Sequence, residues 1–255
     1  MNAEERKQAA ARALPLVDLT DLTDICNHEA IDRLCDRAQT RFGNTGAICI
    51  WPRFVAHAKS RLRGKKLPIA TVVNFPAGDA SVEMTVLETR AALDDGADEI
   101  DLVHPYRAFS SGDETASRAM IEAVKAETEG RGLLKVILET GELTDDQAVR
   151  RASELAIEAG ADFIKTSTGK VPVNATPQVA EIMIQAIADG GKNVGFKPAG
   201  GVKTVEDTAT YLTIADRIMG PDWVSPQTFR FGASGVLDDL LAALEGRAAE
   251  ATNGY

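Results

Sequence analysis

The sequence contains few aromatic residues and few cysteines, and its apolar residues form no long run. Aromatic residues make up 5% of the 255 positions, and there are three cysteines. Cys26, Cys35 and Cys49 are an odd set without a C-x-x-C pair, which argues against a disulfide framework and against a structural zinc site. We therefore expect three buried or half-buried thiols in a reducing compartment.

Histidine content and charge balance exclude further classes of protein. His28, His57 and His104 are scattered along the chain without a metal-binding spacing, so we expect no metal and no cofactor. The 28 Lys and Arg residues are outnumbered by 38 Asp and Glu residues, and the net charge of −10 argues against nucleic acid as a partner. An acidic protein can still bind an anionic substrate if it has a local cationic pocket.

No segment is suited to a membrane or to export. The apolar runs fall far short of the roughly 18 residues that a membrane-spanning helix needs. The first ten residues, MNAEERKQAA, are charged and lack the apolar segment of a signal peptide. We expect a cytoplasmic protein that does not bind membranes.

Short apolar runs alternate with longer amphipathic segments along almost the whole chain. The runs predict strands at Ala47–Ile50, Ile69–Phe75, Glu99–Val103, Leu134–Glu139, Phe163–Thr166, Val194–Pro198, Arg217–Met219 and Phe229–Gly232. The amphipathic segments predict helices such as Val82–Leu93, Glu114–Glu127, Asp145–Glu158 and Pro177–Ala188. Repeated strand–helix units of this number and length predict an α/β fold, a single (β/α)8 TIM barrel spanning residues 1–255.

The two ends of the chain are expected to lie outside the repeated units. Residues 1–44 are predicted to form extra N-terminal helices packed on the barrel, at Ala3–Leu14 and His28–Arg37. Residues 249–255 are predicted to form a flexible C-terminal tail.

Local signals support these helices and reveal a short repeat. Thr144 and Gln147 predict a capping box, and Gly96 and Gly160 are suited to end two helices. Gly96-Ala-Asp-Glu-Ile-Asp101 aligns with Gly160-Ala-Asp-Phe-Ile-Lys165 at an offset of 64 residues (160 − 96). The repeat places Asp101 and Lys165 at equivalent positions, two βα units apart.

Ionisable residues occupy strand positions that should face the inside of the barrel. Side chains alternate between the two faces of a strand, and the apolar neighbours of these residues suit the face that packs on helices. Asp101, Lys135, Lys165 and Lys197 should then point inward from four consecutive strands. One interpretation is a structural ion-pair network, with Lys135 neutralising Asp101, but it leaves two further lysines in excess of the available acids.

A functional interpretation accounts for the excess lysines. Two ammonium groups about 4 Å apart, at an effective dielectric near 20, repel by roughly 4 kcal/mol, or about 3 pKa units. Desolvation acts in the same direction. A lysine could then titrate at about 7 to 8 and attack a carbonyl as a neutral amine. We interpret the cluster as a nucleophile, its cationic activator and a proton shuttle, although spacing alone leaves open which lysine attacks.

Three small polar loops follow the predicted strands at the expected mouth of the barrel. They are Thr166-Ser-Thr-Gly-Lys170, Pro198-Ala-Gly-Gly-Val-Lys203 and Gly232-Ala-Ser-Gly235, the last leading into a helix. Glycine lets backbone N–H groups approach an anion, and helix N-termini favour phosphate. The three loops together predict a phosphate site.

Several segments resemble the deoxyribose-phosphate aldolases. They are Phe163-Ile-Lys-Thr-Ser-Thr-Gly-Lys170, Val194-Gly-Phe-Lys-Pro-Ala-Gly-Gly201, Leu134-Lys-Val-Ile-Leu-Glu-Thr-Gly141, Asn74-Phe-Pro76, Gly96-Ala-Asp-Glu-Ile-Asp101, Asn174-Ala-Thr-Pro177 and Arg230-Phe-Gly-Ala-Ser234. The similarity extends from about Asp18 to the C-terminus. It implies a class I, metal-independent lyase that reversibly cleaves 2-deoxy-D-ribose 5-phosphate into acetaldehyde and D-glyceraldehyde 3-phosphate.

The resemblance also implies residue roles. Lys165 would form the imine, Lys197 would lower its pKa and shuttle protons, Asp101 would move protons through a water, and Lys135 would support it. Residues implied to contact the substrate are Asp18, Thr20, Thr168, Gly169, Lys170, Gly200, Gly201, Lys203, Gly232 and Ser234. The partner would be a small sugar phosphate, and a homodimer or higher homo-oligomer is possible because barrels commonly pair.

Three positions stand apart within this resemblance. Gly235 replaces a second serine that close relatives often carry, so one hydroxyl donor to the phosphate is missing. His104 stands where relatives carry an apolar residue, and we expect it to be a rim residue without a chemical role. Tyr255 ends the chain as in relatives whose terminal tyrosine folds over the active site, and a flexible tail is the alternative.

Other functions remain open at this point. A metal-dependent aldolase would need His or carboxylate ligands gathered in one place. A sugar-phosphate isomerase on the same fold would use a Glu base, for which Glu139 is the candidate. A non-catalytic sugar-phosphate-binding barrel would keep its inward lysines protonated.

Overall fold

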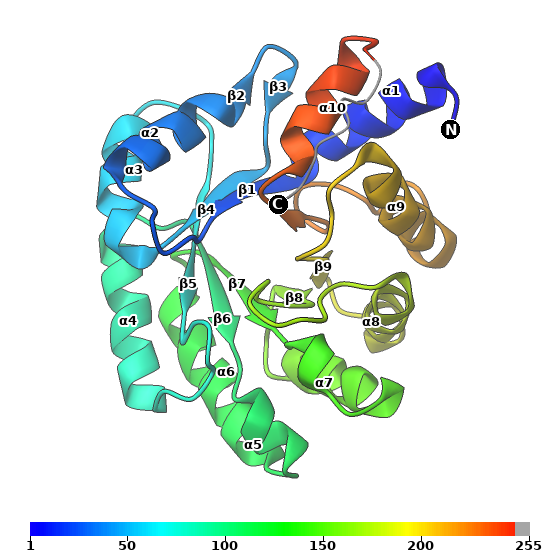
Figure 1. Cartoon of the computed structure of the whole chain (residues 1–255). Coiled ribbons are helices and arrows are strands. Elements are labelled where there is room, and N and C mark those ends of the chain that lie inside the picture. The colour runs from blue at the N-terminus through cyan, green and yellow to red at the C-terminus, as the bar shows by residue number, and fades with distance from the viewer. Residues whose placement is uncertain (248–255) are drawn as a thin grey trace.

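Eight parallel strands form a barrel in the computed structural model, which describes residues 1–247 (Figure 1). Their order in the sheet is β10-β1-β4-β5-β6-β7-β8-β9. The strands are β1 Val17–Asp21, β4 Ala47–Ile50, β5 Ile69–Val73, β6 Glu99–Val103, β7 Leu133–Ile137, β8 Phe163–Lys165, β9 Gly195–Lys197 and β10 Phe231–Ala233. Isolated bridges that join Phe196 to Phe229 and Ala199 to Gly232 link the two ends of the sheet. The predicted (β/α)8 TIM barrel is confirmed.

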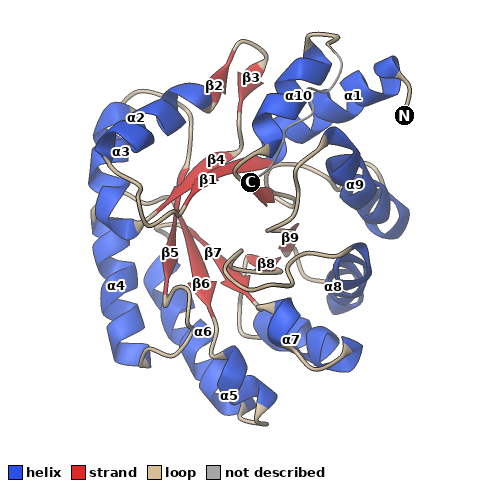
Figure 2. Ribbon diagram, in the orientation of Figure 1, coloured by secondary structure: helices blue, strands red, loops and turns tan. Residues whose placement is uncertain are grey.

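Helices surround the strands on the outside (Figure 2). They are α1 Ala3–Ala13, α2 His28–Arg37, α3 Val55–Arg61, α4 Val82–Asp94, α5 Tyr106–Ser110, α6 Glu114–Thr128, α7 Asp146–Glu158, α8 Pro177–Gly190, α9 Val205–Met219 and α10 Val236–Leu244. Short 3-10 turns occur at Leu14–Leu16, Pro52–Phe54 and Thr140–Glu142, and β2 Gln39–Thr40 pairs with β3 Gly43–Asn44 in a small hairpin. Within residues 1–247 no helix is both long enough and apolar enough to cross a membrane.

The main apolar core lies between the strands and the helices. Ile48, Ile100, Ile164 and Phe196 are 0% exposed and belong to one cluster that includes residues from the surrounding helices. Each such side chain contributes about 1.5–3 kcal/mol through removal of apolar surface from water. This outer packing fixes the strands, so their inward residues can be selected for chemistry.

Two predictions about the strands are wrong. Val17–Asp21 forms the first barrel strand but was not predicted, because polar residues interrupt its apolar pattern. Residues 1–44 therefore hold more than extra helices, and α2 is the crossover between β1 and β4. Arg217–Met219 is the end of α9 and not a strand. Ile218 continues the helical spacing of Tyr211 and Ile214, so the helix period applies there.

Helix ends agree with the sequence except at one cap. Gly96 and Gly160 adopt φ of 104° and 98° after α4 and α7, as glycines beyond a helix end do. The predicted capping box at Thr144 is wrong, because Asp145 is the N-cap and its carboxylate accepts from Ala148 N at 2.9 Å. All three cysteines are free and buried, as predicted.

Candidate active site

Four inward ionisable residues come from four consecutive strands. Asp101 lies on β6, Lys135 on β7, Lys165 on β8 and Lys197 on β9. Asp101 is the register partner of Lys135, and Lys165 is the register partner of Lys197. All four are at most 3% exposed. The alternation of faces thus places them inside the barrel, as the sequence predicted.

Asp101 is the centre of this group. Its Oδ1 accepts from Lys135 Nζ at 2.9 Å, and its Oδ2 accepts from Lys165 Nζ at 2.7 Å and from Lys197 Nζ at 2.8 Å. The three lysines therefore share one carboxylate, although the outer two are 62 positions apart in the sequence (197 − 135).

A second set of charges extends the group away from Lys165. Arg230 Nη1 donates to Asp18 Oδ1 at 2.6 Å, and Arg230 Nη2 donates to Glu99 Oε1 at 2.8 Å. Lys197 Nζ lies 2.5 Å from Asp18 Oδ2, and Lys135 Nζ lies 2.5 Å from Glu99 Oε2. We call Asp18, Glu99, Asp101, Lys135, Lys165, Lys197 and Arg230 the buried network.

Glu99 and Arg230 are members of the network that were not predicted as site residues. The same alternation could have identified them, since Glu99 lies two residues before Asp101 on β6 and Arg230 lies between the buried Phe229 and Phe231. Asp18, which the family resemblance assigns to the sugar hydroxyl, is 0% exposed, and both its oxygens contact cations of the network.

The buried network contains fewer excess cations than the sequence predicted. It holds three carboxylates, on Asp18, Glu99 and Asp101, against four basic groups, on Lys135, Lys165, Lys197 and Arg230. One cation is therefore in excess and not two. A buried charge without a partner is expensive, so one of these groups is expected to be neutral.

Of the four basic groups, Lys165 is the one whose pKa is lowered, so it loses its proton more readily than Lys135, Lys197 or Arg230. Burial lowers the pKa of Lys165, and the positive charge of Lys197 lowers it further, against the opposing effect of Asp101. For Lys197, burial acts to lower the pKa, but the charges of Asp101 and Asp18 outweigh it and raise the pKa above the usual value. Lys135 is likewise raised in pKa, because Asp101 and Glu99 outweigh its burial. Burial is a larger cause at Lys165 than the neighbouring cation on which the sequence argument relied.

The loops that follow β8, β9 and β10 come together at the carboxyl ends of the strands. Gly232 N donates to Pro198 O at 2.9 Å, and Ala199 N donates to Thr166 Oγ1 at 3.0 Å. The predicted substrate-contacting residues on these loops and at the end of β10 are Thr168, Gly169, Lys170, Gly200, Gly201, Lys203, Gly232 and Ser234. Backbone φ is 82° at Gly169 and 84° at Gly201, and a Cβ at either position would meet nothing within 4 Å. These glycines therefore border open space, where a ligand could approach the backbone.

Hydrogen bonds at the mouth of the barrel fix two of the predicted substrate-contacting residues, Thr168 and Lys170. Glu139 Oε2 accepts from Thr168 Oγ1 at 2.6 Å, and Glu139 Oε1 accepts from Thr168 N at 3.1 Å. Lys170 Nζ donates to Leu22 O at 2.7 Å, on the loop after β1. Thr20 Oγ1 donates to Asp18 O at 2.8 Å and is half-buried. Lys203 is exposed, just before the N-cap of α9.

One of the three histidines differs from expectation. His104 is not a rim residue: it is 1% exposed, and its ring nitrogens lie 3.1 Å from Ser117 Oγ and 3.2 Å from Leu138 O. Burial lowers the pKa of His104 to about 4, so it is neutral at pH 7. His28 and His57 are distant in the sequence, but their rings pack edge to face with centroids 4.7 Å apart. Across residues 1–247 no group of three or more His, Cys, Asp or Glu side chains could hold a metal ion.

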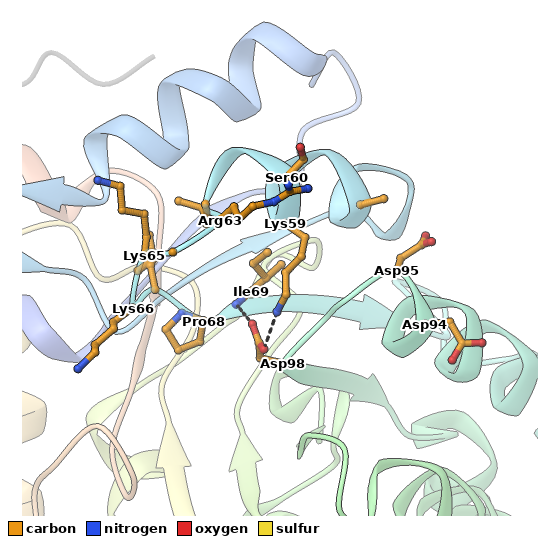
Figure 3. Close-up of a pocket in the computed structure, with 14 residues that line it drawn as sticks. Lys59, Ser60, Arg63, Lys65, Lys66, Pro68, Ile69, Asp94, Asp95 and Asp98 are labelled. Atoms are coloured by element: carbon orange, nitrogen blue, oxygen red, sulfur yellow. Dashed lines mark hydrogen bonds and ion pairs between the residues drawn. The ribbon is translucent and has the colours of Figure 1, made fainter.

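A cavity of about 850 Å³ lies at the opposite end of the strands (Figure 3). It is bordered by Lys59, Arg63, Lys65, Lys66 and Asp98, among others, near the start of β5. Asp98 accepts from Lys59 Nζ at 2.9 Å and from Ile69 N at 2.9 Å, while Lys65 and Lys66 point in different directions. The cavity is therefore separate from the buried network, and its cations do not converge on a common point.

Comparisons with known proteins agree with this geometry. Residues 5–234 match the model of the DeoC/LacD family aldolases. The deoxyribose-phosphate aldolase of Agrobacterium fabrum is 59% identical over 257 residues, covering 100% of this chain and 99% of the relative. The crystal structure of a candidate deoxyribose-phosphate aldolase from Toxoplasma gondii has a TM-score of 0.88 at 25% identity, covering 97% of this chain and 98% of that one.

A more distant solved structure shares the fold alone. The deoxyribose phosphate aldolase from Aeropyrum pernix, described as tetrameric, has a TM-score of 0.76 at 21% identity and covers 95% of this chain and 98% of that one. The full-length match and the residues 5–234 that the family model covers together make the assignment. The chain belongs to the DeoC/LacD family of aldolases.

Proposed function

We propose that the protein is a deoxyribose-phosphate aldolase, a carbon–carbon lyase acting on a small sugar phosphate. It reversibly cleaves 2-deoxy-D-ribose 5-phosphate into acetaldehyde and D-glyceraldehyde 3-phosphate. The full-length relative at 59% identity supports the substrate. The observation that carries the chemistry is Lys165, a buried amine with a lowered pKa beside Asp101 at the mouth of the barrel.

Lys165 is the nucleophile of the proposed mechanism. Its neutral amine attacks the C1 aldehyde of the open-chain sugar, and loss of water from the adduct gives an iminium ion. The iminium accepts the electrons of the C2–C3 bond as the C3 hydroxyl loses its proton. Bond cleavage releases D-glyceraldehyde 3-phosphate and leaves an enamine, which takes a proton at C2. Hydrolysis of the resulting iminium then releases acetaldehyde and regenerates the amine.

Asp101 is the proton carrier of this cycle. Its Oδ2 lies 2.7 Å from Lys165 Nζ, which is within hydrogen-bonding distance for transfer directly or through one water. Lys197 donates to the same oxygen at 2.8 Å, and its positive charge favours a neutral Lys165. Lys135 donates to Oδ1 at 2.9 Å and holds the carboxylate in place.

The remaining proposals concern binding and context. The phosphate binds to the backbone and side chains of the loops after β8, β9 and β10. The segment that holds Asp18 and Thr20 contacts the sugar hydroxyl. Tyr255 and the proposed tail at residues 249–255 lie outside the described residues. A cytoplasmic location and a homo-oligomeric assembly complete the proposal.

Trapping of the imine tests the function. Borohydride added with 2-deoxy-D-ribose 5-phosphate is expected to fix a covalent adduct on Lys165, with acetaldehyde released in its absence. Lys165→Ala should abolish both signals, and a chelator should leave turnover unchanged. An adduct on Lys197, or on no lysine, contradicts the proposed roles. Turnover without an adduct would favour the metal-dependent or isomerase alternatives, and ligand binding without turnover would favour a binding protein.

A further inference from the structure

The charges around Lys165 balance only if Lys165 is neutral. The three carboxylates of Asp18, Glu99 and Asp101 face three other cations, on Lys135, Lys197 and Arg230. We propose that Glu99 and Arg230 are positioning residues for the aldolase reaction, which keep Lys165 in its neutral form by setting the charge of the buried network. The inference rests on the proposed function and extends it to two residues that, among the described side chains, form no ion pair with Lys165.

Arg230 and Glu99 are joined to the reacting end through a continuous series of ion pairs. The guanidinium contacts Asp18 at 2.6 Å and Glu99 at 2.8 Å, and these carboxylates contact Lys197 and Lys135, each at 2.5 Å. Both lysines then contact Asp101. The side chains of this series are at most 5% exposed. Because little water separates these charges, a change of one unit of charge anywhere in the series changes the pKa of Lys165.

Lys165 has the fewest ion pairs of the three lysines, so its deprotonation costs the least electrostatic stabilisation. Lys135 lies within ion-pair distance of Glu99 at 2.5 Å and Asp101 at 2.9 Å, and Lys197 lies at 2.5 Å from Asp18 and 2.8 Å from Asp101. Within residues 1–247 the ion pairs of Lys165 include a single carboxylate, Asp101, which it shares with both other lysines. The network therefore selects Lys165 as the neutral amine by the number of its partners.

The other ionisable groups near Lys165 do not alter the count. Cys49 faces it from β4, and burial raises the pKa of this thiol, so it is uncharged. Glu139, just beyond β7, interacts electrostatically with Lys165, but it accepts two hydrogen bonds from Thr168, forms no ion pair with the described residues of the network, and has its pKa raised by burial. The inward position of β5 at this level is occupied by Val72, the register partner of Asp101, which carries no charge.

Two single variants and the double variant test the charge balance of the buried network. Arg230→Met removes a cation, which should raise the pKa of Lys165 and move the acid limb of kcat/KM upward by about 1–2 pH units, the order expected for a unit charge about 8 Å away at an effective dielectric near 20. Glu99→Gln removes a carboxylate and should move the limb downward by a similar amount. The double variant leaves Asp18 and Asp101 against Lys135 and Lys197. Its limb should return to within about half a unit of the wild type.

The readout is measured on the full-length protein in two ways. One is the pH dependence of kcat/KM for 2-deoxy-D-ribose 5-phosphate, and the other is the pH dependence of Lys165 alkylation by acetaldehyde with cyanoborohydride, located by peptide mass spectrometry. Arg230→Lys keeps the charge and loses only the forked geometry, so it should keep the wild-type profile.

Opposite shifts in the single variants with restoration in the double variant support the proposal. Loss of activity with an unchanged acid limb, not restored in the double variant, assigns Glu99 and Arg230 a structural role and overturns it. If Arg230→Met does not fold, Glu99→Gln alone decides, since an unshifted or raised limb overturns the proposal. A wild-type protein that is alkylated at Lys165 but does not cleave the sugar phosphate contradicts the proposed function and not the charge balance.

Discussion

Two features of Lys165 distinguish it from a solvated lysine. Its side chain is 4% exposed, so its ammonium form is poorly solvated, and the one carboxylate it contacts also serves Lys135 and Lys197. A fully solvated lysine would be protonated at pH 7 and unreactive toward an aldehyde. At the scale of single residues, the reactivity of this amine therefore depends on its immediate neighbours.

Replacing Lys197 should change the pH dependence of the reaction. In Lys197→Met the cation that lowers the pKa of Lys165 is gone while Asp101, which raises it, remains. The pKa of Lys165 should rise, so the acid limb of kcat/KM should move upward by about 2–3 pH units. Activity at pH 7 should fall about 100-fold or more. Rates measured from pH 6 to pH 10 check this, with circular dichroism as the control for folding. An acid limb at its original position would contradict the electrostatic role of Lys197.

Gly235 can accept the side chain that relatives often carry there. Its φ is −103°, and a Cβ would meet nothing within 4 Å, so Gly235→Ser should fold normally. If the loop binds phosphate, the added hydroxyl should lower KM for the phosphorylated sugar about 2–5-fold and leave kcat unchanged. The measurement is kcat/KM for 2-deoxy-D-ribose 5-phosphate relative to 2-deoxy-D-ribose.

A second glycine, Gly232 on β10, provides the matched control. A Cβ at Gly232 would lie 2.7 Å from Ala199 Cβ and 3.2 Å from Lys197 Cε, so Gly232→Ser should lose activity and stability. Equal selectivity for the two sugars in Gly235→Ser and the wild type would argue against phosphate binding by this loop.

Helices outside the barrel keep the strands in register, and their ends are fixed by particular side chains. Helix α1 is tied to α9 and α10 by Arg6, which contacts Glu206 and Asp239, and by Arg12, which contacts Asp216. At this scale the sequence predicted most helices correctly but assigned the end of α9 to a strand. The residues Arg217 to Met219 look like a short apolar run only when the preceding helical spacing is ignored.

The N-cap of α7 distinguishes the observed structure from the predicted capping box. Asp145→Ala should destabilise the protein by about 1 kcal/mol, because Ala148 N loses its acceptor. Thr144→Ala should change the free energy of unfolding by less than about 0.5 kcal/mol, since Thr144 is exposed and not the cap. Urea unfolding of both variants measures the difference, and a larger effect at Thr144 would restore the predicted capping box.

The whole molecule is a barrel with apolar packing outside the strands and charge inside them. Apolar burial between strands and helices stabilises the fold, while the interior holds seven charged or basic side chains from six segments of the chain. Buried networks of this kind specify one arrangement strongly because each unpaired member is costly. The stability of the fold therefore depends mainly on the packing between strands and helices, whereas the reactivity of Lys165 depends on the charged interior of the barrel.

The stability of the molecule should fall as the pH drops from about 6.5 to about 4. His104 has a pKa of about 4 in the folded state against about 6.5 when unfolded, so the unfolded chain binds more protons in this interval. Its contribution, up to roughly 3 kcal/mol, is complete above pH 6.5 and is lost as the pH falls toward 4. Urea unfolding at pH 7 and pH 5 should show a smaller pH dependence in His104→Gln than in the wild type. The same dependence in both proteins would exclude His104 as its source.

The sequence alone determined the strand–helix alternation, the inward direction of Asp101, Lys135, Lys165 and Lys197, and the glycine loops at the carboxyl ends of the strands. These follow from local rules, since alternation of faces and helix ends depend on neighbouring residues. Tertiary structure decided the rest: that Val17–Asp21 is a strand, that His104 is buried, and that Glu99 and Arg230 complete the buried network. The lowered pKa of Lys165 was also decided by the tertiary structure. Its burial, and the sharing of one carboxylate by three lysines, arise only when distant segments meet.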